Sequence, residues 1–108
     1  MTQAPAAKAV RAGQALGAPG MPTISIFFGI VVQMYWRDHP PPHFHAYYQG
    51  HEALFAIADG DLLEGTMPPG ARRIIQSWTR RHKAELLENW ERCKMHQPLH
   101  TVPGADEE

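Results

Sequence analysis

The chain has 108 residues, which fits one domain, and its 44% apolar residues are enough to form a core. The formal net charge of −1 gives no overall signature of a polyanion-binding protein, and the single cysteine, Cys93, excludes an internal disulfide and a cysteine metal cluster. No apolar run approaches the length that spans a membrane, and a lone thiol fits a reducing cytoplasm, which is the expected location.

Composition divides the chain into three parts. Residues 1–20 are rich in alanine, glycine and proline and contain no acidic residue, so we expect a disordered leader without a secretory signal. Residues 21–96 hold all the aromatic residues and most of the aliphatic ones, and they form the single predicted domain. Pro98 cannot continue a helix, and residues 97–108 are predicted to be a flexible tail.

The first element of the predicted domain is a strand. Apolar residues occupy every second position over seven positions: Ile24, Ile26, Phe28, Ile30, Val32, Met34 and Trp36. Strict alternation is typical of a strand with one buried face. Gly29 interrupts the pattern and predicts a bulge or kink, or a division into two strands.

A proline–histidine motif follows, with the sequence Asp38-His39-Pro40-Pro41-Pro42-His43-Phe44-His45-Ala46. Three consecutive prolines cannot continue a helix or pair inside a sheet, so the first half of the motif is predicted to be a stiff, extended connector. The second half begins a strand over 43–48. His43, His45 and Tyr47 then share one face, with the two histidine Cα atoms roughly 6.5 to 7 Å apart.

A hairpin follows that strand. Gln49-Gly50 predicts a two-residue turn into a second strand over 51–58. The resulting pairs are Tyr48 with His51, Tyr47 with Glu52, Ala46 with Ala53, and His45 with Leu54. A further turn at Asp59-Gly60 leads to a short strand over 61–65.

Residues 69–95 show helical spacing of apolar side chains, which predicts one long helix or two helices broken near His82. The fold class is therefore α+β: a small antiparallel meander of three to four strands, packed on one face by the C-terminal helix or helices. The predicted core comprises Ile26, Phe28, Ile30, Val32, Phe44, Phe55, Ile57, Ile75, Trp78, Leu86 and Trp90.

The histidine face supports two kinds of chemistry. A divalent, zinc-like metal ion is one, because neutral imidazole is a common ligand; the predicted ligands are His43 and His45 with His39, or with Glu52, as the third. Metal-free RNA cleavage is the other, with His43 and His45 as base and acid and Tyr47 stabilising charge. A purely structural role, in which the histidines form hydrogen bonds around the connector, stays open.

A basic stretch gives a third candidate site. Five basic residues and no acidic one lie between positions 72 and 83: Arg72, Arg73, Arg80, Arg81 and Lys83. Such a surface can bind a protein partner or nucleic acid, although most basic helix faces are merely solvated. Trp78 and Trp90 belong to the apolar stripe and are expected in the core.

The chain resembles the uncharacterised bacterial family catalogued as domain of unknown function 4160. The resemblance covers about 21–96 and rests on segments 21–25, 27–30, 38–39, 41–46, 52–54, 64–65 and 86–91. It implies a small cytoplasmic α+β protein, encoded beside another small protein in a toxin–antitoxin-like pair. Residues 1–20 lie upstream of the usual start of the family.

The first function predicted is therefore that of a partner-binding component of a two-gene module. The alternative is a histidine-dependent hydrolase or ribonuclease, with or without a metal, that uses the motif from Asp38 to His45. The expected partner is a small protein encoded nearby; nucleic acid and a second copy of the chain are the other partners considered. Whether the protein is an enzyme stays open at this point.

Overall fold

The structure is a computed structural model that describes residues 22–36 and 38–108. The predicted leader, residues 1–20, lies outside the described residues. The strands are β1 (Thr23–Phe27), β2 (Ile30–Gln33), β3 (His43–Tyr48), β4 (His51–Ala56) and β5 (Leu62–Gly65). The helices are α1 (Pro69–Arg81), α2 (Lys83–Lys94) and the short 3-10 helix η2 (Ala105–Glu107).

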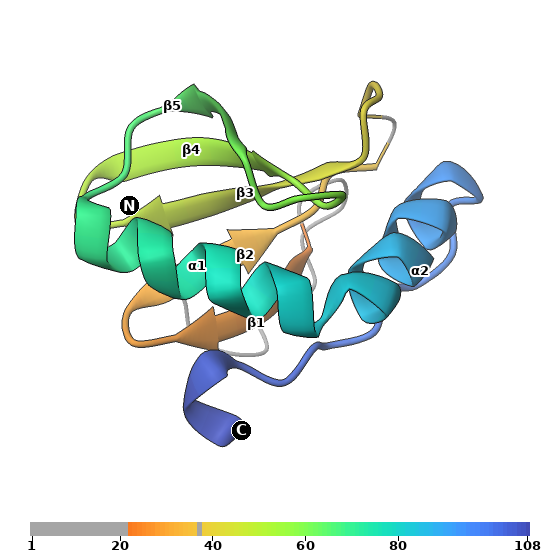
Figure 1. Ribbon diagram of the computed structural model, residues 1–108. Coiled ribbons are helices and arrows are strands. Elements are labelled where there is room, and N and C mark those ends of the chain that lie inside the picture. The colour runs from red at the N-terminus through yellow and green to blue at the C-terminus, as the bar shows by residue number, and fades with distance from the viewer. Residues whose placement is uncertain (1–21, 37) are drawn as a thin grey trace.

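The strands form one antiparallel sheet in the order β1-β2-β3-β4-β5, and α1 lies across one face of it (Figure 1). The α+β meander is confirmed, with five strands instead of three to four. The two short helices that were one of the alternatives are present, and they are separated at His82. None of the helices in the described ranges is long and apolar enough to cross a bilayer.

The extra strand arises from a hairpin at Phe28-Gly29, where both residues have positive φ angles of 51° and 79°. In a two-residue hairpin Phe27 pairs with Ile30, so these two side chains share a face. Phe27 and Ile30 are buried, whereas Phe28 is 58% exposed. The placement of Phe28 in the core was therefore wrong.

Ile26 is also exposed, which corrects its predicted place in the core. The register of β1 shifts between Thr23 and Ser25, and this irregularity reverses which side chains face inward over the rest of the strand. After the shift Ser25 and Phe27 are buried, and Ile26 points to the opposite side. The remaining residues predicted for the core are all buried.

The hairpin of β3 and β4 has the predicted register, with Tyr48 opposite His51 and Ala46 opposite Ala53. Both turn residues have left-handed backbones, Gln49 with φ 46° and Gly50 with φ 82°, as a type I′ turn requires. This register sends Phe44, Ala46, Ala53 and Phe55 to one buried face and His43 and His45 to the other.

Trp78 of α1 joins the helical layer to the sheet. Its indole ring packs edge-on against Phe44, with centroids 5.7 Å apart, and lies 4.9 Å from the ring of Phe27. The indole N–H donates to the carbonyl of Pro103 at 2.8 Å, which satisfies the one polar atom of a fully buried side chain.

The segment after α2, for which the sequence predicts a flexible tail, lies along the outer edge of β1 (Figure 1). Val102 N–H donates to the Ile24 carbonyl at 2.8 Å, and Ser25 Oγ donates to the Val102 carbonyl at 2.8 Å. The buried Asn89 side chain bonds both the N–H and the carbonyl of His100 at 2.9 Å. The tail thus satisfies buried polar groups of β1, α1 and α2.

Candidate metal centre

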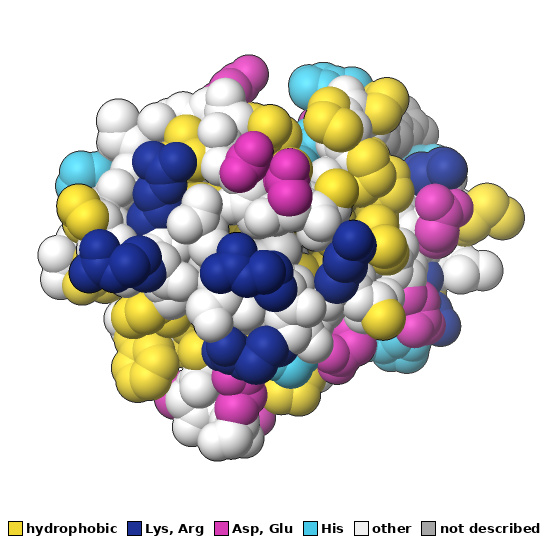
Figure 2. Space-filling view, viewed as in Figure 1, with side chains coloured by type: hydrophobic (Ala, Val, Ile, Leu, Met, Phe, Trp, Pro, Cys, Tyr) yellow, Lys and Arg dark blue, Asp and Glu magenta, His cyan; other side chains and the backbone are white. Residues whose placement is uncertain are grey.

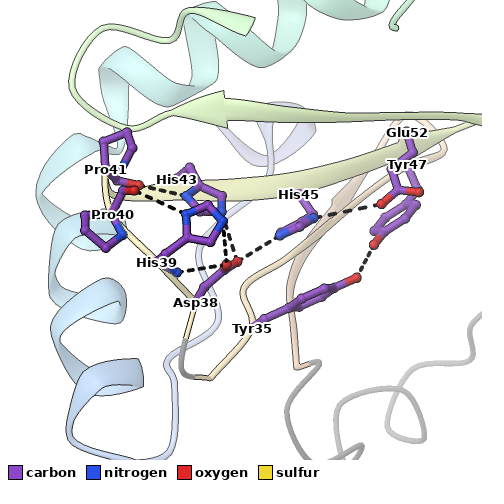
Figure 3. A network of polar contacts seen from close by, with 9 residues as sticks. All are labelled: Tyr35, Asp38, His39, Pro40, Pro41, His43, His45, Tyr47 and Glu52. Carbon is purple, nitrogen blue, oxygen red and sulfur yellow. Dashed lines mark hydrogen bonds and ion pairs between the residues drawn. The ribbon is translucent and has the colours of Figure 1, made fainter. Parts of the chain in front are cut away.

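The connector before β3 and the strand itself bring three polar side chains together. Asp38 precedes the prolines, and His43 and His45 project from the same face of β3, because strand residues two apart point the same way. Figure 3 shows both imidazoles directed at the Asp38 carboxylate. One ligand atom from each residue lies within 4.8 Å of the others.

Asp38 is the centre of the group. Its Oδ2 atom lies 2.9 Å from His43 Nε2 and 3.0 Å from His45 Nε2. Its Oδ1 atom accepts the backbone N–H of His39 at 3.0 Å, which fixes the rotation of the carboxylate. One carboxylate oxygen therefore faces two ring nitrogens at contact distance.

The tautomer of His43 follows from its other nitrogen. Nδ1 lies 2.7 Å from the carbonyl oxygen of Pro41, and a carbonyl only accepts, so Nδ1 bears a hydrogen. The ring is 1% exposed and lies 5.3 Å from the Trp90 ring, so its orientation is fixed. Its Nε2 atom is left to face Asp38.

His45 is held differently. The Tyr35 ring stacks on its imidazole at 4.0 Å, and the residue is 8% exposed. Its Nδ1 atom is buried and has no hydrogen-bond partner. The nearest carboxylate oxygen, Glu52 Oε2, is 3.9 Å away, beyond hydrogen-bond distance.

The group differs from the ligand set predicted from sequence by one member. His39 is 77% exposed at its side chain, and its Nδ1 lies 3.2 Å from the Pro40 carbonyl, so it stands outside the group. Asp38 takes its place, and Glu52, the other predicted third ligand, lies on the far side of His45. An acidic residue five and seven positions before two histidines was the overlooked signal in the sequence.

Tyr47, the third predicted catalytic residue, is engaged elsewhere. Its hydroxyl forms a hydrogen bond with the hydroxyl of Tyr35. Burial, together with this bond, raises the pKa of the Tyr47 phenol well above its usual value. Near neutral pH Tyr47 is therefore a neutral hydrogen-bonding group rather than a phenolate.

A shallow hollow of about 150 Å³, measured with its open mouth, borders Asp38. Its other lining residues are Tyr35, Trp90, Cys93 and Lys94. Burial, and then the charge of Asp38, raise the pKa of Cys93 to about 11. The thiol consequently stays protonated near neutral pH and is a poor nucleophile.

Comparisons with known proteins identify the family. A family model described as Domain of unknown function (DUF4160) matches residues 29–91, which is more than half of the chain and includes Asp38, His43 and His45. The chain belongs to the DUF4160 family. A search of curated proteins and a search of solved structures each give no match.

The basic stretch of this DUF4160 domain lies on α1 and the start of α2, away from the histidine motif in the sequence. All five side chains are exposed, and Lys and Arg side chains are spread over the face that α1 presents (Figure 2). Within the described ranges, Arg81 is the member of the five that forms an ion pair, at 2.5 Å to Glu108. Binding of nucleic acid or protein by this surface stays a prediction.

The ionisation of Asp38 links the site to stability. Burial opposes ionisation, but hydrogen bonds from His45 and from the His39 N–H outweigh it, so the pKa of Asp38 lies below its usual value of 3.8. A lowered pKa in the folded state stabilises the fold above the pKa of the unfolded chain, and this stabilisation is lost as the pH falls through the folded pKa.

We therefore expect Asp38→Asn to destabilise the metal-free DUF4160 domain at pH 6 and to lose this deficit progressively as the pH falls below the usual aspartate value of 3.8. Urea unfolding of both proteins at several pH values, with chelator present, measures the difference in free energy of unfolding. A deficit that stays constant from pH 6 to pH 2.5 would contradict this account of Asp38.

Proposed function

We propose that this DUF4160 protein binds a divalent, zinc-like metal ion through Asp38, His43 and His45 and uses it in hydrolysis. Two imidazoles and one carboxylate form a ligand set that zinc accepts in hydrolytic enzymes. A metal bound there supplies a Lewis acid and an activated water molecule.

The observation that supports this proposal most directly is the commitment of His43 Nδ1 to the Pro41 carbonyl. Metal-binding histidines usually donate their second ring N–H to a carbonyl or carboxylate, which directs the other nitrogen at the metal. His43 already has this arrangement, and its free Nε2 faces Asp38 Oδ2 at 2.9 Å, where two lone pairs need a proton or a cation between them.

The surroundings favour a catalytic rather than a structural type of centre. Structural zinc sites close four protein ligands around the ion, whereas catalytic sites use three and keep a position for water. Here the group offers three ligand atoms, and a shallow hollow borders one of the three residues, Asp38. Trp90 and Tyr35 line this hollow with aromatic rings.

The test is the metal content of protein purified without a histidine tag. We expect about one equivalent of transition metal in the wild type and none in the double variant His43→Ala/His45→Ala. The matched control is His51→Ala/His100→Ala, which removes two histidines outside the group and should keep the metal. Absence of metal from the wild type after incubation with zinc and gel filtration would reject the proposal.

Partner binding, the first function predicted from the sequence, is retained as a second candidate. Phe28 is 58% exposed at the tip of the β1–β2 hairpin, and Ile26 beside it is also exposed. Aromatic side chains are enriched in the buried centre of protein–protein contacts. If this is the contact, Phe28→Ser should abolish co-purification with the product of the neighbouring gene; a toxin–antitoxin role itself stays a prediction from the resemblance.

A further inference from the structure

We propose that Glu52 is the positioning residue of His45: its carboxylate accepts the Nδ1–H of His45 when His45 Nε2 binds the metal. This inference rests on the proposed metal function and deepens it. It extends the centre from three residues to a chain that runs from the Pro41 carbonyl to the Glu52 carboxylate.

The starting point is an unpartnered nitrogen. His45 is more than nine-tenths buried, and its Nδ1 atom is buried without a hydrogen-bond partner. A buried N–H left without an acceptor destabilises the folded state. In the absence of metal this penalty is avoided if the ring's one hydrogen sits on Nε2, which faces Asp38 at 3.0 Å.

Metal binding excludes the tautomer of His45 that carries its hydrogen on Nε2. A neutral imidazole that binds a cation through Nε2 must place its hydrogen on Nδ1. The hydrogen of His45 then points away from Asp38, toward the side where Glu52 Oε2 lies 3.9 Å from Nδ1 (Figure 3). His43 needs no such change, because its Nδ1–H is already bonded to Pro41.

Glu52 is placed to follow this change. It lies on β4 opposite Tyr47 and shares the sheet face of His45, because directly paired residues point to the same side. Its side chain is 56% exposed, so rotation about its single bonds meets little packing resistance. A movement of about 1 Å shortens the contact to an ordinary hydrogen bond of about 2.8 Å.

The charges also fit. Asp38 supplies one negative charge to the ligand set, and Glu52 supplies a second behind His45. Together they balance a divalent cation, and a carboxylate bonded to Nδ1–H increases the basicity of the metal-bound nitrogen. Tyr47 and Tyr35, the other titratable side chains beside this face, are neutral phenols, since burial raises the pKa of both.

The experiment measures zinc affinity by competition with a chelating dye. We expect Glu52→Ala to weaken zinc binding by about 10- to 100-fold, the usual effect of removing an outer-shell partner of a metal-bound histidine. Glu52→Gln keeps an acceptor without the charge and should lie between the wild type and Glu52→Ala. Glu64→Ala, which removes an exposed carboxylate from β5, is the matched control and should bind zinc like the wild type.

A spectroscopic readout separates positioning from general destabilisation. In the zinc-loaded wild type, the His45 Nδ1–H should give a slowly exchanging ring N–H resonance in ¹⁵N–¹H NMR spectra, and this resonance should be lost in Glu52→Ala. Zinc affinity and this resonance unchanged in Glu52→Ala would overturn the role of Glu52 and leave the metal site standing. A wild type that binds no zinc would instead overturn the proposed function itself.

Discussion

Val102→Asp is expected to lower the free energy of unfolding by about 2 to 4 kcal/mol, because it places a carboxylate where a buried valine anchors the tail to β1. The decrease in the free energy of unfolding cannot exceed the free energy of detaching the tail, since the tail can detach and leave the sheet folded. Detachment of the tail would break the hydrogen bond from the Trp78 N–H to the Pro103 carbonyl and the two hydrogen bonds between the Asn89 side chain and the His100 backbone. Urea unfolding followed by tryptophan fluorescence measures the change.

Thr101→Asp is the matched control for that substitution. Thr101 is the neighbouring residue of the same tail, but its side chain is exposed. A change within about 0.5 kcal/mol is therefore expected there. If the two variants have equal stability, the contacts between the tail and β1 do not contribute to folding.

Zinc is expected to stabilise the wild-type protein by about 4 kcal/mol when its free concentration is about a thousand times its dissociation constant. The gain arises because Asp38, His43 and His45 converge only in the folded chain, being joined through the connector and β3. Asp38→Asn should lose most of this gain, because an amide is a far weaker ligand than a carboxylate. Thermal unfolding at several free zinc concentrations gives the measurement.

Asp59→Asn is the control for the zinc experiment, because Asp59 is an exposed acid in the loop before β5. It should show the full stabilisation by zinc. Equal stabilisation of Asp38→Asn and the wild type would assign the effect to zinc bound elsewhere on the protein.

Local chemistry explains which parts of the fold were predictable. Gln49-Gly50 sets the register of β3 and β4, because a two-residue turn with two left-handed backbones permits one pairing. Helical spacing up to Trp90 located the helical region but left one long helix and two helices broken near His82 as alternatives, and the structure has the two helices. Alternation failed at Ile26 and Phe28, since a bulge and a hairpin change the inward side without changing the spacing of apolar residues.

The site was predictable only in part for a related reason. His43 and His45 share a face because they are two apart on one strand. Asp38 joins them because of the path of the three-proline connector. Its place five and seven positions before the two histidines is a signal in the sequence, but this spacing alone does not give the path of the connector. The docked tail is similar: the hydrogen bond between Ser25 and Val102 joins residues 77 positions apart, a separation that no local pattern reveals.

The tail along β1 also matters while the chain is being made. β1 is an outer strand of the sheet, and its free edge is a template for pairing with another chain until Val102 bonds Ile24. Because Val102 is synthesised long after β1, its bond to Ile24 forms only after residue 102 has left the ribosome. When several ribosomes translate one mRNA, nascent chains lie close together, and aggregation through the exposed edge of β1 is therefore favoured. The opposite edge of the sheet is less prone to this pairing, because β5 is four residues long and bears the acidic Glu64.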